Sequence, residues 1–317
     1  MFIIYRKNTN SERPFPPRSG KYRACTLSDT FSAEDTFTTI MSKHWEGTSY
    51  APVFFPHKQQ KLPPNIPELA EAYTKAKCSG SFLEYVQQHL SHADIDILQG
   101  KTHAQHKSPL WRRQRIGAIT STTMHKAVHY KHNQSDNYIV QEVMGQSNFH
   151  GNMATKYGKQ TEPVAKKLYI EYMQQKHTKF KVSSCGLFIK KDNPLIRATP
   201  DGIVSCRCHG TGLLEIKCPY SDSARPFSGR EIAESGTYNV TLGENGQIKL
   251  KTSCPWYTQI QTHLGVSGYQ WCDFVMYTEK SPHLTVDRIY FDQNKFEKDS
   301  NMAMAFYDKF VLPKLML

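Results

Sequence analysis

Two acids and a lysine lie close together in the sequence and could act as one catalytic group. Asp201 belongs to a Thr-Pro-Asp-Gly segment (residues 199–202), and Glu215 and Lys217 follow fourteen and sixteen residues later. Alternate side chains of a strand share one face, so Glu215 and Lys217 would project together while Ile216 points into the core. Carboxylates bind hard cations through oxygen, and a lysine can orient or deprotonate an attacking water and counter charge on phosphorus. The pattern therefore predicts metal-assisted hydrolysis of phosphodiesters.

The pattern is informative because the Pro-Asp-Gly and Glu-x-Lys motifs occur together and are flanked by apolar residues. Pro-Asp-Gly alone is an ordinary turn sequence, and Glu-x-Lys alone is common on strands. Here the charged residues interrupt apolar stretches at 203–204 and 213–216, where an unpaired charge is costly. The alternative is a turn aspartate beside an ion pair on an edge strand.

The chain around these residues predicts an α/β fold with a small central mixed sheet and helices on both faces. The sequence predicts a helix after residues 120–123, and Asn193-Pro194 and His209-Gly210 supply turns. Helices are expected at about 161–176, 255–266 and 294–312, the last stopping at Pro313, and strands at about 183–190, 195–198, 202–206, 212–217, 272–278 and 285–291, with a hairpin at 238–251.

The N-terminal third differs in composition from the rest. Residues 1–66 are rich in Pro, Ser, Thr and Lys and lack periodicity, whereas residues 67–98 show helical apolar stripes. A polar link at 99–108 follows. We therefore divide the chain into an N-terminal extension of unknown role, 1–98, and a main domain, 108–317.

The composition favours a polyanionic partner and a globular protein. The chain has 317 residues, a formal net charge of +12 and 12% aromatic residues. Such an excess of positive charge suits DNA or RNA first and an acidic membrane surface second, while solubility alone is the alternative. The apolar start is too short for a signal peptide, no stretch is long enough to span a membrane, and the eight cysteines follow no repeating frame. We expect a soluble intracellular protein with mostly reduced thiols, nuclear if the source is eukaryotic.

Four motifs in order resemble the PD-(D/E)XK nuclease superfamily and, more narrowly, the YqaJ viral-recombinase, or lambda-exonuclease-like, family. They span about 108 to 292 and leave residues 1–98 uncovered. They are Trp111-Arg-Arg-Gln-Arg115-Ile-Gly-Ala-Ile-Thr120, Gly158-Lys-Gln-Thr-Glu162-Pro-Val-Ala165, Thr199-Pro-Asp-Gly202 with Leu214-Glu-Ile-Lys-Cys-Pro219, and Trp256-Tyr-Thr-Gln259-Ile-Gln261.

The resemblance implies a role for each acidic or polar residue of the predicted catalytic group. Asp201, Glu215 and the backbone carbonyl of Ile216 would bind Mg²⁺ or Mn²⁺, with Glu162 as a further carboxylate. Lys217 would position or activate the water, and Gln259 would orient the lysine or the phosphate. From the sequence, Glu162 falls in the first turn of its helix beside Pro163, where an acid also suits the helix dipole. For Gln259 the alternative is an exposed helix face.

A second site is predicted where hydroxyl residues open a helix. Thr120, Ser121 and Thr122 present N–H and O–H groups that can bind phosphate, and Arg115 adds a bidentate charge. By resemblance this region holds the DNA backbone or a terminal 5′-phosphate. The chain has Thr-Ser-Thr where the family usually has Thr-Ala-Ser, but a hydroxyl is retained at Thr122. The alternative is a plain helix cap followed by a surface arginine.

The resemblance implies a 5′-to-3′ exonuclease on duplex DNA with a free end, acting in recombination or repair. A single-strand annealing protein and a homo-oligomer are possible partners. Two alternatives remain: a structure-specific endonuclease on the same core, or a non-catalytic DNA-binding module, which would not need the acid–acid–lysine set.

Cys206-Arg-Cys208-His209, with Cys218 nearby, invites a zinc interpretation. The spacing is not that of a usual zinc knuckle, and no fourth ligand has a clear spacing. We expect these thiols to occupy a hairpin turn and small core positions instead.

Overall fold

A computed structural model describes residues 62–131, 138–148, 151–220 and 227–317. Most of the predicted irregular stretch, residues 1–61, lies outside the described residues. Contacts group Leu62–Leu317 into one unit. Among the described residues, no helix combines the length and apolar character needed to cross a membrane.

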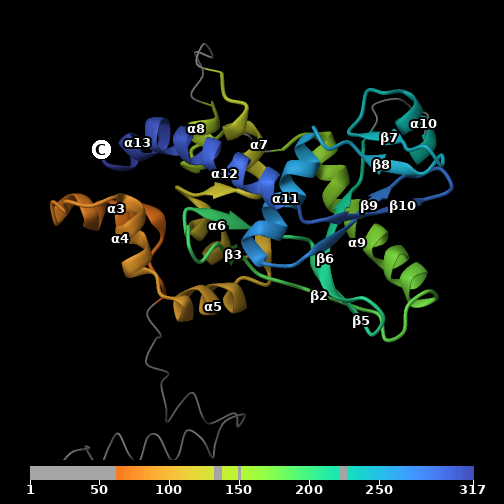
Figure 1. Ribbon diagram of the computed structural model, residues 1–317, viewed down its shortest axis with the longest axis horizontal. Helices are drawn as coiled ribbons and strands as arrows, with labels where there is room; N and C mark the ends of the chain where they lie inside the picture. Colours follow the sequence, from red (N-terminus) through yellow and green to blue (C-terminus); the bar gives the residue numbers. More distant parts are fainter. Residues whose placement is uncertain (1–61, 132–137, 149–150, 221–226) are drawn as a thin grey trace, which may run out of the picture. The chain divides into compact units, whose positions relative to one another are not determined.

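The core of this unit is a five-stranded mixed sheet in which β6 is central (Figure 1). Every neighbouring pair is antiparallel except β6 and β9, which run parallel. The register places Glu215 of β6 beside Phe274 of β9. In spatial order the strands are β10 (Leu284–Tyr290), β9 (Trp271–Tyr277), β6 (Gly210–Lys217), β5 (Gly202–Cys206) and β2 (Lys181–Ser183).

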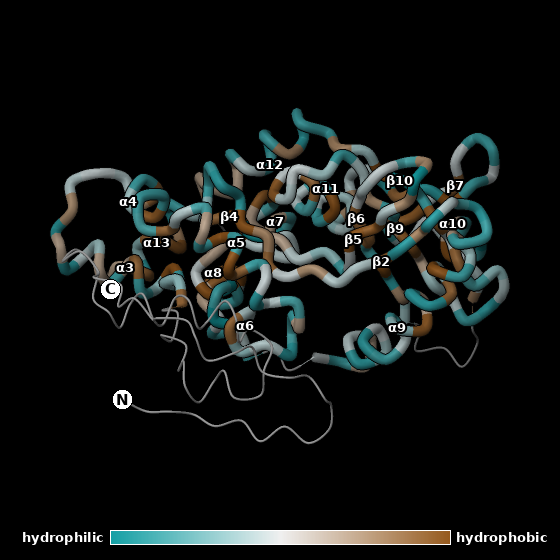
Figure 2. The backbone as a smooth tube through the Cα atoms, turned by 90° about the horizontal axis from the view of Figure 1, so that it is seen from below, coloured by the Kyte–Doolittle hydropathy of each residue, from teal (hydrophilic) through white to brown (hydrophobic). Residues whose placement is uncertain are grey.

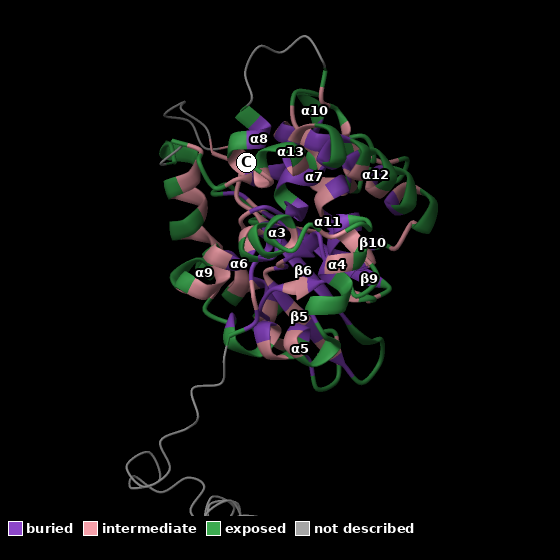
Figure 3. Cartoon of the chain, turned by 90° about the vertical axis from the view of Figure 1, so that its left-hand side faces the viewer, coloured by how far each residue is buried: buried purple, intermediate pink, exposed green. Residues whose placement is uncertain are grey.

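Two helices cover opposite faces of this sheet and explain its apolar strands. On one face, Ile260 of α11 (Pro255–Ser267) shares a hydrophobic cluster with Leu213 of β6. On the other, Tyr169 of α9 (Met153–Gln174) shares a cluster with Ile216. A strand covered on both faces needs apolar side chains in both directions, and buried segments gather around β6 and α11 in Figure 3.

Helix α9 differs from its prediction. The pattern indicated a start near residue 161, but the helix begins at Met153, with Asn152 as its N-cap accepting from the backbone of Thr155. Pro163 therefore lies inside the helix, and Glu162 is not in its first turn. Much of α9 is drawn in hydrophilic teal in Figure 2, and only one stripe of it is buried. The buried stripe of α9 begins only at Ala165, so the sequence pattern did not indicate a helix start at Met153.

A smaller three-stranded sheet separates strands that the sequence analysis grouped together. Its order is β1-β4-β3, with β1 parallel and β3 antiparallel to the central β4. Residues 199–201 thus connect β4 of one sheet to β5 of the other. The strands are β1 (Ile119–Thr120), β3 (Phe188–Ile189) and β4 (Ile196–Ala198).

Helices precede these sheets, as expected for residues 67–98. Each of the first three begins at a capping box, on Asn65, Ser81 and Ser91. Ile66 shares a hydrophobic cluster with Tyr307 near the C-terminal end. The division between 1–98 and 108–317 stays a prediction, because this cluster joins the two. The segments are α3 (Ile66–Lys75), α4 (Phe82–His89), α5 (His92–Lys101), η1 (Gln105–Lys107) and α6 (Pro109–Arg115).

The single strand expected at 183–190 is wrong: this stretch forms β2 and β3, which belong to different sheets, and between them the Leu187 N–H bonds the Thr102 hydroxyl instead of a neighbouring strand. Two further predictions concern the hairpin and the C-terminal helix. The hairpin expected at 238–251 forms from β7 (Val240–Leu242) and β8 (Ile248–Leu250). The last helix does not stop at Pro313, because a π-helical turn leads into α13, which holds that proline in its first turn, where no N–H is needed. The other segments are α7 (Ser121–Val128), α8 (Tyr138–Val143), α10 (Gly229–Glu234), α12 (Gln293–Phe306), η2 (Tyr307–Val311) and α13 (Leu312–Leu315). The predicted α/β fold, a small mixed sheet with helices on both faces, is confirmed.

Candidate active site

Asp201 lies at the crossover between the two sheets, directly before β5. Its carboxylate Oδ2 accepts a 2.7 Å hydrogen bond from the backbone N–H of Ile216, and its own N–H donates to the carbonyl of Leu214. The Lys166 ammonium of α9 donates to the Asp201 carbonyl at 2.7 Å. These bonds join Asp201 to β6 and α9, so its carboxylate is fixed beside the Glu-Ile-Lys segment.

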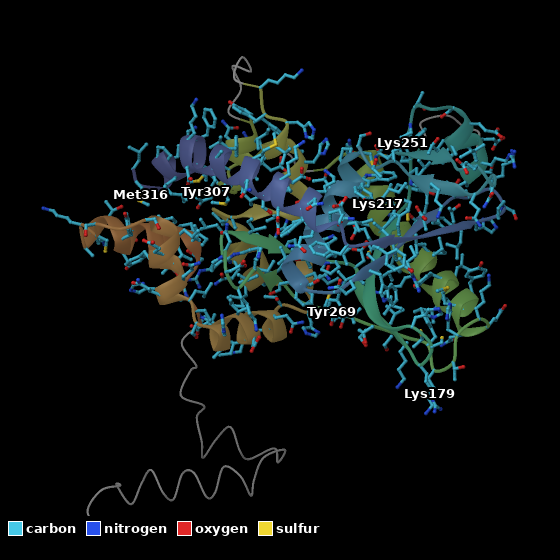
Figure 4. All side chains as sticks on the ribbon, viewed as in Figure 1. Lys179, Lys217, Lys251, Tyr269, Tyr307 and Met316 are labelled. Carbon is cyan, nitrogen blue, oxygen red and sulfur yellow. The ribbon has the colours of Figure 1, made fainter. Side chains whose placement is uncertain are left out.

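Glu215 is the most enclosed of the predicted residues, with 1% of its surface exposed. Its Oε1 accepts from Lys217 Nζ and from Gln259 Nε2, each at 2.7 Å. Gln259 Oε1 accepts in turn from Lys217 Nζ at 3.0 Å, which closes a three-membered ring of contacts. His263 Nε2 lies 3.1 Å from the second carboxylate oxygen. The expected common face of Glu215 and Lys217 is observed, and Figure 4 shows Lys217 within the sheet region.

The positions of these side chains follow from the periods of a strand and a helix. Glu215 and Lys217 alternate with the core residue Ile216 along β6. Gln259 and His263 are four residues apart on α11, which puts them one above the other on the helix face turned to β6. Gln259 is therefore not on an exposed face.

Burial and neighbouring charges together shift the pKa values of Asp201 and Glu215 in opposite directions. Burial raises the pKa of Asp201 well above its ordinary value, and the charges of Glu215 and Glu162 raise it further. Burial also opposes ionisation of Glu215, but Lys217 and His263 outweigh it and lower the pKa of Glu215 to about 2. The two acids of the site therefore differ, with a lowered pKa at Glu215 and a raised pKa at Asp201.

Glu162 contributes a third carboxyl to the same electrostatic environment. Burial raises its pKa, and the charge of Glu215 raises it further. This coupling brings Glu162 into the group from the middle of α9, so the helix dipole is not a reason for its position. Lys166, one turn along α9, lowers the pKa of Glu162 and partly offsets the negative charge.

The carboxyl groups of this site are of the donor type that suits a hard divalent cation. The negative charge of Glu215 raises the pKa of both Asp201 and Glu162, and carboxylate oxygens are the ligands that Mg²⁺ or Mn²⁺ takes. The N–H of Ile216 points at Asp201, and because the N–H and C=O of a strand residue point to the same edge, the Ile216 carbonyl faces the same side of β6. A cation held there would offset the charges of Glu215 and Glu162, which add to burial in raising the pKa of Asp201.

Arg115 and the threonines of α7 form a second group. Arg115 Nη2 donates to Thr122 Oγ1 at 3.1 Å and lies 3.4 Å from Thr120 Oγ1. The guanidinium also lies 4.3 Å from the centre of the Trp111 ring. Burial lowers the pKa of Arg115 to about 10, so it remains charged at neutral pH. These residues border a pocket of about 190 Å³.

Ser121 does not share this pocket. It is 2% exposed and is absent from the pocket lining, which includes Thr120, Thr122 and Thr123. Thr123 exchanges cap hydrogen bonds with Thr120. The phosphate group expected at 120–122 can therefore meet the two threonines, but not the serine side chain.

Two residues of the catalytic group were not predicted. His263 follows Gln259 by four residues, a spacing that could have indicated it. Lys166 follows Glu162 by four residues and could have been found in the same way. Gln261, in contrast, bonds the backbone of Tyr290 and Asp292 and holds α11 against the chain that follows β10.

A protein-family model matches half of the chain. The model described as the YqaJ-like viral recombinase domain matches residues 110–270, which include every predicted site residue. An uncharacterized protein, R354, of Acanthamoeba polyphaga mimivirus is 27% identical over 213 residues, which is 65% of this chain and 34% of that protein. The chain therefore spans about a third of the length of the curated relative it matches.

Solved structures of similar architecture come from a bacterium and a virus. An alkaline exonuclease, LHK-Exo, from Laribacter hongkongensis is 25% identical, with a TM-score of 0.48 over 64% of this chain and 92% of that one. The shutoff and exonuclease protein of Kaposi's sarcoma-associated herpesvirus is 13% identical, with a TM-score of 0.45 over 91% of this chain and 95% of that one.

Proposed function

Since the chain belongs to the family of YqaJ-like viral recombinase domains, we propose that it hydrolyses phosphodiester bonds of DNA with the help of a divalent metal ion. The observation that carries the proposal is the enclosure of Glu215, whose two oxygens meet Lys217, Gln259 and His263. A buried carboxylate with this many partners, whose charge also raises the pKa of the half-buried Asp201, costs stability and therefore indicates a function.

The proposed metal ligands are Asp201, Glu215, Glu162 and the Ile216 carbonyl. A bound Mg²⁺ or Mn²⁺ would act as a Lewis acid on the scissile phosphate and counter its negative charge. The protein itself supplies ionised carboxylate oxygens to the metal ion. Lys217 and His263 keep Glu215 ionised, and the Ile216 N–H fixes the orientation of Asp201.

Lys217 is proposed to hold the attacking water and to balance charge on phosphorus. Burial lowers its pKa, but Glu215 and Asp201 outweigh this effect and raise the pKa above its ordinary value. A protonated lysine donates hydrogen bonds and cannot accept the water's proton, which favours positioning over general-base action. Gln259 keeps the Nζ atom pointing at the reaction site through its 3.0 Å contact.

The reaction proposed is in-line hydrolysis. Water attacks phosphorus, the bond to the 3′ oxygen breaks, that oxygen takes up a proton, and the product carries a 5′-phosphate. Arg115, Thr120 and Thr122 are proposed to bind a backbone or terminal phosphate in the neighbouring pocket. Family membership supports a 5′-to-3′ direction on duplex DNA in recombination or repair, with an annealing protein or further copies of the chain as partners.

A cleavage assay tests this function directly. Linear duplex with 5′-phosphate, linear duplex with 5′-hydroxyl and closed circular duplex are incubated with Mg²⁺ or Mn²⁺ and, separately, with chelator. Release of mononucleotides from the linear substrates alone supports an exonuclease, whereas cleavage of the circle supports an endonuclease.

Glu215→Gln is the matched variant for this assay. It keeps the side-chain shape but removes the charge, so cleavage should fall by more than about 100-fold while DNA binding persists. Unchanged cleavage in this variant would contradict the site. Binding of DNA without cleavage by the unaltered protein would identify a non-catalytic DNA-binding module.

A further inference from the structure

Four side chains that can bind a soft metal meet at the end of the β5–β6 hairpin. They are His177, Cys206, Cys208 and His209, and their ligand atoms all lie within 4.8 Å of one another. His177 follows the end of α9, Cys206 ends β5, and the other two lie in the turn to β6. Residues from two separate segments therefore converge on one point.

Three of the six distances between these ligand atoms lie close to the edges of a zinc tetrahedron, and the other three are no longer than 4.8 Å. The sulfur atoms of Cys206 and Cys208 are 3.4 Å apart, His177 Nδ1 is 3.1 Å from the Cys208 sulfur, and His209 Nδ1 is 3.7 Å from the Cys206 sulfur. Four ligands bound at about 2.0–2.3 Å around a tetrahedral Zn²⁺ lie roughly 3.3–3.8 Å from one another. Two thiolates and two imidazoles are also a common structural zinc ligand set.

We propose that His177, Cys206, Cys208 and His209 bind one Zn²⁺ ion in a structural site. The sequence supplied three of these ligands but no fourth, and the fold supplies it from His177, 29 residues before Cys206 in the chain. Cys218, the thiol near them in the sequence, is not part of the group. With four protein ligands and no open position, the site suits structure and not catalysis.

A disulfide or a set of ordinary hydrogen bonds fits the geometry of these four side chains less well. A disulfide between Cys206 and Cys208 requires sulfur atoms about 2.05 Å apart, and both cysteines are free. Ordinary thiol hydrogen bonds are weak and do not bring two sulfurs and two ring nitrogens together. The backbone N–H of His209 donates to the Cys206 sulfur at 3.3 Å, a contact that stabilises a metal-bound thiolate.

The site is separate from the candidate active site. Cys206 lies five residues along β5 from Asp201, about 16 Å at the rise of a strand. Figure 4 shows Lys179, two residues after His177, projecting at the edge of the molecule, far from Lys217. The ion would fasten the end of α9, which carries Glu162, to the hairpin that carries Asp201 and Glu215.

The environment of the site is basic, which bears on its charge. Lys176, Lys179, Lys181 and Arg207 are all exposed around it. A divalent ion placed among these cations needs compensation, and the two thiolates supply it, leaving the Zn²⁺ site neutral. The backbone N–H of Arg207 also bonds the carbonyl of Thr178, so the two segments already touch beside the ligands.

The test measures metal bound to the full chain. Protein purified in a reductant that does not bind metals is dialysed with Zn²⁺, and its zinc content is determined. We expect one ion per chain that resists exchange by excess Mg²⁺. Replacing Zn²⁺ with Co²⁺ should give the visible absorption of a tetrahedral thiolate site.

Variants test whether these four residues, and not other thiols or the nuclease site, hold the zinc ion. Cys208→Ser and His177→Gln, both confirmed as folded by circular dichroism, should lose the bound ion and the cobalt absorption. Cys78→Ser removes a free thiol elsewhere in the unit and should keep both, as should Glu215→Gln, which alters only the nuclease site. Wild-type protein with no retained zinc, or folded Cys208→Ser and His177→Gln that retain as much as wild type, would overturn the proposal. Neither result depends on whether the protein cleaves DNA.

Discussion

The indole N–H of Trp111 donates a 3.0 Å hydrogen bond to the hydroxyl of Thr199, two residues before Asp201. The same indole ring lies beneath the guanidinium of Arg115, which faces the α7 threonines. One side chain thus connects the pocket proposed for phosphate to the segment that presents Asp201. A disturbance at Trp111 should therefore reach both groups.

Trp111→Phe keeps the ring beneath Arg115 but removes the donor to Thr199. We expect a loss of about 1 kcal/mol in the free energy of unfolding, measured by chemical denaturation. Thr199→Val removes the other partner, and the double variant should lose less than the sum of the two single losses. Strictly additive losses would show that this hydrogen bond does not couple the two segments.

Arg115→Ala should reduce the preference for a 5′-phosphorylated end. A charged hydrogen bond contributes about 1.5–3 kcal/mol, so binding of the phosphorylated duplex should weaken by roughly 10- to 100-fold. Binding of the 5′-hydroxyl duplex should change less, as measured by fluorescence anisotropy. The control is Arg113→Ala, because Arg113 pairs with Glu68 away from the pocket. Equal weakening on both substrates would assign Arg115 to the DNA backbone instead of its end.

Gln259→Ala should slow cleavage without abolishing DNA binding. Its amide contacts both Glu215 and Lys217, and the loss of such an orienting partner typically costs about 10- to 100-fold in activity. We expect the decrease in kcat, with little change in KM for the DNA. Gln270→Ala, on an exposed side chain of the segment after α11, is the matched control and should retain full activity.

Asp201→Asn should stabilise the protein when no divalent ion is present. Burial and the charges of Glu215 and Glu162 raise the pKa of Asp201, so its protonated form stabilises the fold. That contribution is fully present below the pKa of the unfolded chain and is lost as pH rises through the higher folded pKa. In chelator, the Tm of the wild type should therefore fall more steeply than that of the variant as the pH rises above 3.8, the ordinary pKa of an aspartate.

Addition of Mg²⁺ should restore the Tm that the wild type loses at higher pH, but should have little effect on Asp201→Asn. At about 100 times its Kd, a bound ion contributes about 2.7 kcal/mol, enough to raise Tm by roughly 5 °C or more. The increase should be larger at pH 8 than at pH 5, because ionised carboxylates bind the ion. Asp192→Asn, an exposed acid, serves as the control. A similar Mg²⁺ shift in Asp201→Asn would remove Asp201 from the ligand set.

The sequence by itself determined the features that depend on local periodicity. Glu215 and Lys217 share a face because a strand alternates its side chains, and Gln259 belongs to a helix whose pattern and boundaries were predictable. The α/β class followed from the same periods. The early start of α9 was not found, because its first turns carry no apolar stripe and Pro163 suggested a helix beginning.

Only the tertiary structure decided which distant residues meet. His263 reaches Glu215, Trp111 reaches Thr199, and His177 joins Cys206, because helices pack on a sheet whose strand order does not follow the chain. Burial also exists only in the folded state, and it is the main cause that raises the pKa of Asp201. The residue types indicated the chemistry, whereas packing decided which groups share one environment and how strongly their charges interact.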